Sequence, residues 1–474
     1  MTTTSEKPAG VNHKAGFFIG VTCPGCGGEL ELEDNFFVLT CDHCGSHLKV
    51  VMPDKPAAFM VTPKINQREI RFSIDRYLKE KKLPLTGSDL QYKSVLYPYW
   101  KIDGAMLKVR TSVEKKVIYG ESDDYRDRGV ESETLRTDTT LLPSVLTFAA
   151  GPEFDGVPAS LGMRTEYITI VPFSEDRIDD DFGALHVTVE MEEAKQHAMH
   201  AINKLTNLAA VSSGPNKSEL LNPSGSLVFF PYIAVETYSP SYYRFLIDGL
   251  TGRVEHFANN PAPHTGDDQP EITADFGALT VDFHRCTECG EDLPAGRSYV
   301  YICGNCSHIN RYDPITAPDC KVEWADGSYD SEDGLFPFWS FTLPEDEGEA
   351  VRRVFGGIYK SNQLVIPAFA IPSFEAMFRL SKRMSAALAK IPSDTVDSFS
   401  SRFTPVTQPH STACMLAEVI VYRDMAQRDP KTSFDKVNLH PTGVRLIYVP
   451  FHPEHYFYVD SVLNAVTFEK TLVE

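Results

Sequence analysis

Cys23-Pro24-Gly25-Cys26 and Cys41-Asp42-His43-Cys44 are two C-x2-C pairs separated by 14 residues. The arrangement recurs at Cys286-Thr287-Glu288-Cys289 and Cys303-Gly304-Asn305-Cys306, with a spacer of 13 residues. This spacing lets four thiolates converge on one tetrahedral metal ion, and it is a strong signal for Zn²⁺. We therefore predict two zinc sites, each with four cysteine ligands and one ion. The ligands are Cys23, Cys26, Cys41 and Cys44 in the first site, and Cys286, Cys289, Cys303 and Cys306 in the second.

Iron is the alternative metal. The C-P-x-C-G pattern of Cys23 to Gly27 also occurs in rubredoxin-like electron carriers, whose iron is likewise held by four sulfur atoms. Three histidines, His43, His47 and His308, lie beside the cysteine pairs. Because each set already has four thiolates, we expect these histidines at the surface or behind the ligands.

Length and composition describe an ordinary globular protein. A chain of 474 residues is too long for one hydrophobic core, so several domains are expected. The composition, 42% hydrophobic and 23% charged, is typical of soluble proteins. No apolar run approaches the roughly 18–20 residues that span a bilayer, and no signal-peptide pattern precedes Phe17. We expect a cytoplasmic protein without a membrane span, in which the isolated Cys320 and Cys414 are buried thiols.

The net charge of −20 argues against nucleic acid as a partner, because affinity for nucleic acid depends on Lys and Arg contacts to phosphate. Residues 18–50 carry five acidic side chains against Lys49, a net charge of −4. Residues 283–312 carry three basic and three acidic side chains. Neither segment has the excess of basic residues that a phosphate-binding surface needs. Basic or neutral proteins are the better expectation for partners.

Markers beyond the cysteines also recur in order. Tyr97-Pro98-Tyr99-Trp100 resembles Phe336-Pro337-Phe338-Trp339, and Leu227 to Tyr232 resembles Leu446 to Phe451. The sequence therefore predicts an α+β, β-rich fold of two tandem pseudo-repeats, each a zinc ribbon followed by an antiparallel sheet domain with one or two helices. The expected boundaries are a flexible tail (1–16), ribbon 1 (17–52), β-rich domain 1 (53–262), ribbon 2 (263–318) and β-rich domain 2 (319–474).

Local patterns predict individual elements. Apolar spacing of 3.6 residues predicts helices over 67–83, 191–208 and 373–391. An alternating stretch at 29–33 and an apolar one at 36–40 predict a hairpin that turns at Asp34-Asn35. The polar stretch 114–139 is expected to be an exposed hairpin or long loop. Ile170 to Phe173 and Val365 to Phe369 are expected to be equivalent strands.

No catalytic motif is present: the chain has no nucleophile elbow, Walker loop, HExxH or GxGxxG. His197 and His200 share a helix face without a third ligand. The two tryptophan motifs are expected to be core anchors rather than ligand platforms. Enzyme activity therefore has no support in the sequence, and no small-molecule substrate can be named.

The eight paired cysteines resemble those of the zinc-ribbon superfamily, whose members include transcription factors, primosomal helicases and bacterial adaptor proteins. The resemblance covers only the two cysteine segments. The rest is weakly similar to uncharacterised bacterial zinc-ribbon proteins that carry a proline-aromatic-tryptophan strand. The leading hypothesis is a non-catalytic zinc-binding scaffold, adaptor or assembly subunit of a protein complex. The alternatives are a nucleic-acid-processing accessory protein, associated with a helicase or with transcription, and a rubredoxin-like iron electron carrier.

Overall fold

The computed structural model describes residues 18–473 except for short internal segments. These segments are 34–37, 52–54, 86, 88, 119–129, 163–167, 175–181, 209–215, 239–240, 260–275, 278, 297, 313–319, 326–331, 357–360, 389–392, 396–402 and 429–433. Over the described residues the chain is α+β and strand-rich, with five α-helices and several antiparallel sheets, which confirms the predicted class. The predicted tail, 1–16, lies outside this part. None of the described helices is long and apolar enough to cross a membrane.

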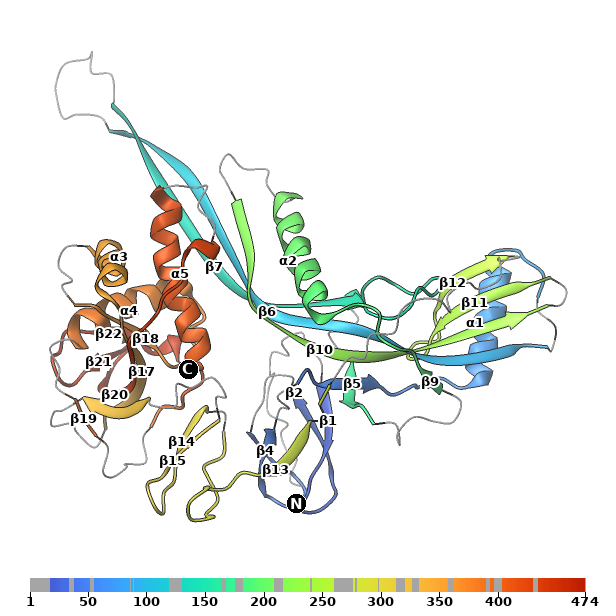
Figure 1. Cartoon of the computed structure of the whole chain (residues 1–474), viewed down its shortest axis with the longest axis horizontal. Coiled ribbons are helices and arrows are strands. Elements are labelled where there is room, and N and C mark those ends of the chain that lie inside the picture. Colours follow the sequence, from blue (N-terminus) through green and yellow to red (C-terminus); the bar gives the residue numbers. More distant parts are fainter. Residues whose placement is uncertain are drawn as a thin grey trace, which may run out of the picture.

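The first half of the chain forms an elongated sheet (Figure 1). Counted over the described residues it has ten strands. Seven of them lie in the spatial order β12 (Val254–Asn259), β11 (Tyr243–Asp248), β10 (Asn216–Thr237), β5 (Ala58–Val61), β8 (Thr169–Pro172), β1 (Phe18–Thr22) and β2 (Glu29–Glu33). The other three are β6 (Gln91–Ile118), which also pairs with β10, and its neighbours β7 (Val130–Ala149) and β9 (Phe182–Ala184).

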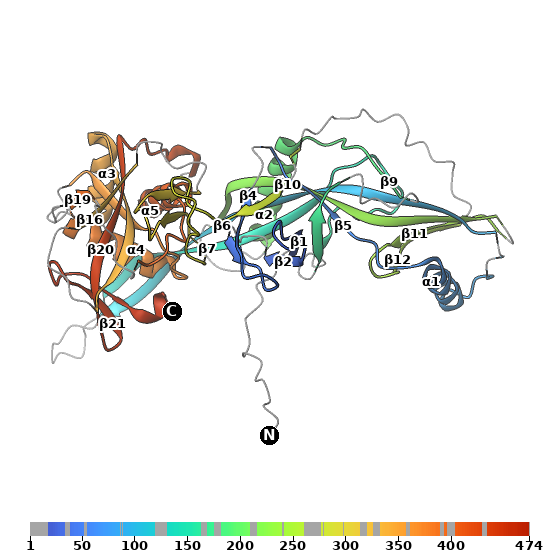
Figure 2. The ribbon, with the colours of Figure 1, turned by 90° about the horizontal axis from the view of Figure 1, so that it is seen from below.

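The predicted hairpin around 114–139 belongs to a much longer pair of strands. β6 and β7 pair antiparallel from Tyr99↔Ala149 to Ile118↔Val130. Together with β10 they form an arm that runs from the centre of the molecule past the second half (Figures 1 and 2).

Two predicted helices flank this sheet. α1 (Gln67–Glu80) begins at a capping box, in which the Asn66 side chain accepts backbone N–H bonds and Glu69 accepts the N–H of Asn66. Its buried residues Ile70, Ile74 and Leu78 share a hydrophobic cluster with β10 and β11. α2 (Met191–Leu208) lies on the other part of the sheet, over β10.

The second half forms its own sheet, with seven strands in the described residues. The order is β18 (Gln363–Pro367), β17 (Gly334–Thr342), β20 (Gly443–Glu454), β16 (Lys321–Ala325) and β19 (Ser393–Thr395). β21 (Phe457–Asp460) and β22 (Thr467–Glu469) continue from β20. Three helices pack here, α3 (Glu345–Phe355), α4 (Phe374–Leu388) and α5 (His410–Arg428).

The expected one or two helices per half is therefore wrong for the second half. The pattern at 373–391 predicts α4, but α3 and α5 were not predicted. α5 buries eight of the ten residues from Ala413 to Tyr422, with Ala413, Leu416, Val419, Ile420 and Tyr422 in one cluster. A helix buried on several sides has no polar stripe, and its sequence lacks the 3.6-residue alternation.

The two tryptophan motifs occupy matching positions. Trp100 pairs with Leu227 between β6 and β10, and Trp339 pairs with Leu446 between β17 and β20. In each case a third strand runs parallel to the partner strand, β5 beside β10 and β16 beside β20. Each indole N–H donates to a carbonyl close before a helix, Val189 O at 2.7 Å before α2 and Gln408 O at 2.9 Å before α5.

The two aspartates that follow also match. Asp248 pairs with Tyr232, and Asp460 pairs with Phe451. Both carboxylates are buried and accept backbone N–H bonds of the next turn. In both halves a buried aspartate therefore holds the turn that follows its strand, through residues 250 and 251 in the first half and 463, 465 and 466 in the second.

The expected match of Ile170–Phe173 with Val365–Phe369 is not supported by the strand pairings. β8 pairs with β5 and β1, whereas β18 pairs with β17. The position of β18 corresponds to the end of β7: the Ala368 N–H donates to Pro337 O, as the Ala150 N–H donates to Pro98 O.

Candidate metal centres

Each C-x2-C pair lies in the turn of a short hairpin. We call residues 18–51 module 1 and residues 284–312 module 2. In module 1, β1 and β2 enclose the first pair, and β3 (Val38–Thr40) and β4 (His47–Val51) enclose the second. In module 2, β14 (Val300–Ile302) and β15 (Ile309–Arg311) enclose the last pair. The hairpin predicted from 29–33 and 36–40 is wrong, because β2 pairs with β1 and β3 pairs with β4.

The geometry of the cysteine turns explains why β2 and β3 do not pair with each other. Cys23 N–H donates to Gly28 O, and Gly27 N–H donates back to Cys23 O, both at 2.9 Å. Cys41, Cys286 and Cys303 start turns of the same form. Gly27, Gly45 and Gly290 have φ of +75° to +76°, a conformation that suits glycine. Each cysteine pair therefore closes its own hairpin, so the spacer strands β2 and β3 pair with β1 and β4 and not with each other.

The structure brings the four sulfur atoms of each predicted site together, all within 4.8 Å of one another. The Sγ–Sγ separation is 3.7 Å for Cys23–Cys44 and for Cys26–Cys41. In module 2 it is 3.6 Å for Cys286–Cys306 and 3.5 Å for Cys289–Cys303. A tetrahedron with Zn–S bonds of about 2.3 Å has sulfur atoms about 3.8 Å apart. The spacing is thus close to that of a tetrathiolate metal site and far above a disulfide bond of about 2.05 Å.

The electrostatics of module 1 favour a bound cation. The Ser46 hydroxyl and backbone lower the pKa of Cys44 to about 6. The Gly28 backbone acts to lower the pKa of Cys26, but burial and the sulfur atoms of Cys44, Cys23 and Cys41 raise it to about 12. Negative charge on one sulfur raises the free-energy cost of ionising a neighbouring thiol, because like charges repel. A divalent cation removes that repulsion, so the site fits a metal ion that keeps all four sulfurs as thiolates.

Module 2 has an additional group behind its ligands. Asn310 is 3% exposed, and its Nδ2 lies 3.6 Å from Cys286 Sγ. Its Oδ1 accepts the backbone N–H of Thr287 at 2.9 Å and the Thr287 hydroxyl at 3.1 Å. Asn310 therefore orients the first cysteine pair of module 2. The matching position in module 1, seven residues after the third cysteine, is Leu48.

Both sites have the ligand set of a structural metal. The first cysteine of each pair is buried and the second is exposed. Four protein ligands fill a tetrahedron and leave no position for a substrate or a reactive water. Zinc and iron both accept four thiolates, so this geometry is compatible with either metal.

The histidines differ in their surroundings. The Nδ1 of His47 lies 2.9 Å from Leu293 O, so this side chain joins the two modules. His284, which sequence reasoning missed, is fully buried and packs against the rings of Tyr301 and Tyr312, at centroid distances of 4.4 Å and 5.3 Å. Of the isolated cysteines, Cys320 is buried as expected, and Cys414 is half-buried, with its sulfur 3.5 Å from His410 Nε2.

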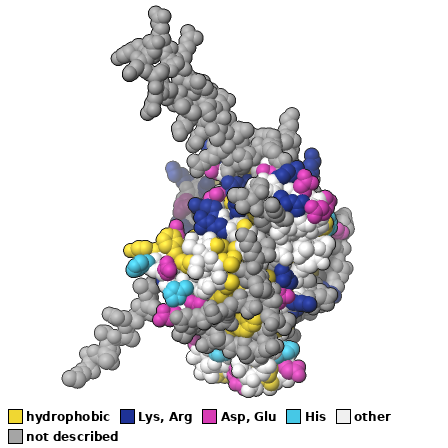
Figure 3. Space-filling view, turned by 90° about the vertical axis from the view of Figure 1, so that its left-hand side faces the viewer, with side chains coloured by type: hydrophobic (Ala, Val, Ile, Leu, Met, Phe, Trp, Pro, Cys, Tyr) yellow, Lys and Arg dark blue, Asp and Glu magenta, His cyan; other side chains and the backbone are white. Residues whose placement is uncertain are grey.

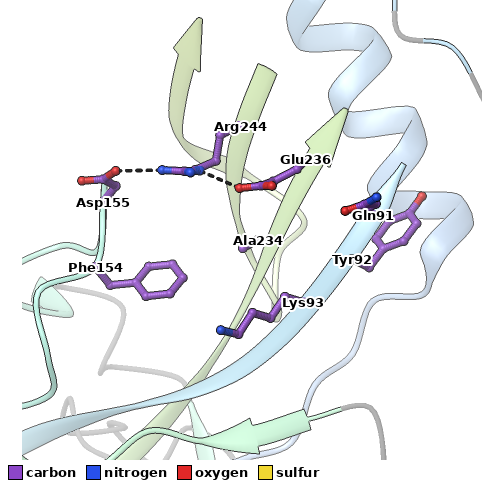
Figure 4. Close-up of a pocket in the computed structure, with 8 residues that line it drawn as sticks. All are labelled: Gln91, Tyr92, Lys93, Phe154, Asp155, Ala234, Glu236 and Arg244. Carbon is purple, nitrogen blue, oxygen red and sulfur yellow. Dashed lines mark hydrogen bonds and ion pairs between the residues drawn. The ribbon is translucent and has the colours of Figure 1, made fainter. Parts of the chain in front are cut away.

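A small pocket lies elsewhere, at the far end of the long sheet (Figure 4). Arg244 is its most buried charged group. Its guanidinium donates to Glu236 at 2.8 Å and to Asp155 at 3.2 Å, so β11, β10 and the loop after β7 are joined. Lys93 and Phe154 also line the pocket (Figure 4). Because the arginine is neutralised by two carboxylates, the simplest role of this cluster is to hold the loop on the sheet.

Comparison of the chain with protein-family models, with curated proteins and with solved structures yields no match, so its function is inferred from the residues themselves.

Proposed function

We propose that the chain is a non-catalytic, zinc-binding scaffold or assembly subunit. The observation that carries this proposal is the pair of complete four-cysteine sets. A metal bound there has no open coordination position, so its contribution is to stability and shape. Zinc is the expected metal because Zn²⁺ is redox-inactive and a scaffold needs no redox-active ion. The zinc-ribbon superfamily remains the nearest description of the cysteine modules.

We also propose that the two halves are pseudo-repeats. Support comes from the matched pairings of Trp100 and Trp339, and of Asp248 and Asp460. These pairings depend on the register of the strands, and a chance similarity between two short sequence motifs would not produce the same register. A duplicated architecture without a catalytic set suits a protein that presents surfaces to partners.

Two exposed surfaces lie at opposite ends of the elongated molecule (Figures 1 and 2). At one end, the outer face of α1 carries Phe72, which is 67% exposed. Residues 64–82 hold seven exposed basic side chains against three acidic ones, a net charge of +4 in a chain of −20. The basic ones are Lys64, Arg68, Arg71, Arg76, Lys79, Lys81 and Lys82. An exposed aromatic ring among arginines has the composition of a protein-interface hot spot.

At the other end, hydrophobic side chains gather on the face formed by the second half (Figure 3). The turn between β20 and β21 exposes Tyr456 by 80% and Phe457 by 44%, and Leu463 nearby is 39% exposed. Two separated surfaces with exposed aromatic residues fit a protein that bridges two partners.

Metal analysis and co-purification test this proposal together. The full chain, purified from native lysate, is expected to contain two zinc ions and to retain specific partner proteins. Phe72→Ser and Tyr456→Ser should each lose a partner while keeping zinc, whereas Met199→Ser, at a residue 44% exposed on α2, is the matched control. A lone monomer with no retained protein, or variants indistinguishable from the control, would count against the scaffold.

The same preparation separates the two alternatives. A coloured, iron-containing protein would favour an electron carrier. The basic face of α1 is the feature that favours a nucleic-acid accessory. Filter binding to duplex and single-stranded DNA tests this hypothesis, and low salt is the most permissive condition because electrostatic affinity for DNA is highest there. We expect no retention there, because the remainder of the chain carries a net charge of −24.

A further inference from the structure

The two cysteine modules share one small sheet. β13 (Thr280–Phe283), which leads into module 2, pairs antiparallel with β4 of module 1 through four residue pairs, from Thr280↔Val51 to Phe283↔Leu48. β4 is the central strand of the order β13-β4-β3. Two further hydrogen bonds extend the contact: His284 N–H donates to His47 O at 2.9 Å, and His47 Nδ1 lies 2.9 Å from Leu293 O. The predicted boundary at 263 places β13 in ribbon 2 (263–318), whereas its strand partner β4 belongs to module 1.

The modules also share a hydrophobic cluster. Val38 of module 1 packs with Leu293, Tyr301 and the buried ligands Cys286 and Cys303 of module 2. All five side chains are at most 4% exposed. A module 1 residue thus completes the apolar surroundings of two ligands of the other site.

Each strand in this contact connects directly to a ligand turn. β3 ends at Thr40, immediately before Cys41, and β4 begins at His47, three residues after Cys44. β13 ends three residues before Cys286. The Phe283 ring lies against Gly25 of the first turn in module 1. Closing either metal site therefore fixes backbone that the other module uses as a packing surface.

We infer that the two sites bind metal cooperatively, as one unit; this inference rests on the proposed metal sites. Small cysteine modules order only when metal is bound, so their binding free energy includes folding free energy. Once one module is ordered, the shared sheet and the Val38 cluster are largely in place, and the second module loses less conformational freedom on binding. Coupling of this kind is reciprocal, and it typically changes affinity by about 5- to 150-fold.

Competitive titration of the metal-free full chain with Zn²⁺ against a chromophoric chelator tests the coupling. The wild type is expected to take up two ions in one steep step. Cys44→Ser should weaken binding at module 2, and Cys289→Ser should weaken binding at module 1 by the same factor, about fivefold or more. A dissociation constant for each remaining site that equals the wild-type value within twofold would overturn the inference.

Variants that keep all eight ligands guard against simple unfolding. Val38→Ala removes the shared contact and should split the single step into two. Leu30→Ala removes a buried side chain of module 1 that belongs to the hydrophobic cluster of the first-half sheet and not to the Val38 cluster. It should lower the affinity of module 1 and leave the coupling factor unchanged. Two independent sites in the wild type would refute cooperativity but leave the scaffold intact, whereas a wild type that binds no zinc would refute the proposed metal sites themselves.

Discussion

Asn310 is expected to tune the affinity of module 2 without being a ligand. In Asn310→Leu, the Cys286 sulfur loses its contact with Nδ2, and the Thr287 N–H loses its acceptor at 2.9 Å. A fully buried donor left unpaired costs about 1–3 kcal/mol, and the part-buried Thr287 N–H should cost an amount at the low end of this range. Loss of a group behind a metal ligand typically lowers affinity about 10- to 100-fold, which corresponds to about 1.4–2.7 kcal/mol. Both estimates agree, so we expect a 10- to 100-fold loss of zinc affinity at module 2.

The measurement is a chelator competition in a Cys44→Ser background, where only module 2 retains four cysteine ligands. Leucine is a fair replacement because Leu48 holds the matching position in module 1. Asn310→Asp is the complementary variant, since it keeps an acceptor for Thr287 but loses the N–H donor and adds negative charge beside the thiolates. It should weaken binding as well. Affinities within threefold of the parent for both variants would refute a positioning role for Asn310.

Three further predictions concern stability. Asp460→Ala leaves the backbone N–H groups of Leu463, Ala465 and Val466 without their acceptor and should lower the free energy of unfolding in urea by about 3–5 kcal/mol; a negligible loss would contradict this accounting. Trp339→Phe removes the buried hydrogen bond of 2.9 Å from the indole N–H to Gln408 O and should lower the free energy of unfolding in urea by about 1–3 kcal/mol. An unchanged urea midpoint would contradict this prediction. Removal of metal by a chelator should expose residues 18–51 and 284–312 to trypsin before the rest of the chain; uniform or unchanged cleavage would argue against metal-dependent folding of the modules.

The cysteine sites were predictable because metal geometry constrains sequence spacing directly. Four ligands with fixed bond lengths require short turns, and C-x2-C encodes such turns locally. The predicted hairpin at 29–40 was wrong for the same reason. Each cysteine turn joins two strands into its own hairpin, so β2 pairs with β1 and β3 pairs with β4. The role of Asn310 could not be predicted from the sequence, because it depends on contacts with Cys286 and Thr287 that only folding brings close.

The fold was predictable where its pattern is local and was missed where it is not. α1, α2 and α4 each place apolar residues on one face, so their periodicity revealed them. α5 is apolar on several sides, which removed that signal. The length of β6 was also hidden, because the polar stretch from 114 onward gives no apolar pattern that joins it to the strand before it, although β7 pairs with both parts. The division into domains 53–262 and 319–474 stays a prediction.

That division has to account for the arm of β6, β7 and β10. Leu107, Val109 and Leu221 of the arm are at most 5% exposed, and they belong to the same hydrophobic cluster as Trp339 and the helix α5 of the second half. Burying one such side chain contributes about 1.5–3 kcal/mol, so the three together contribute about 5–9 kcal/mol. This sum is comparable to the whole stability of a typical domain. The second half therefore depends on the first for part of its core, and the contact between the cysteine modules also joins the halves.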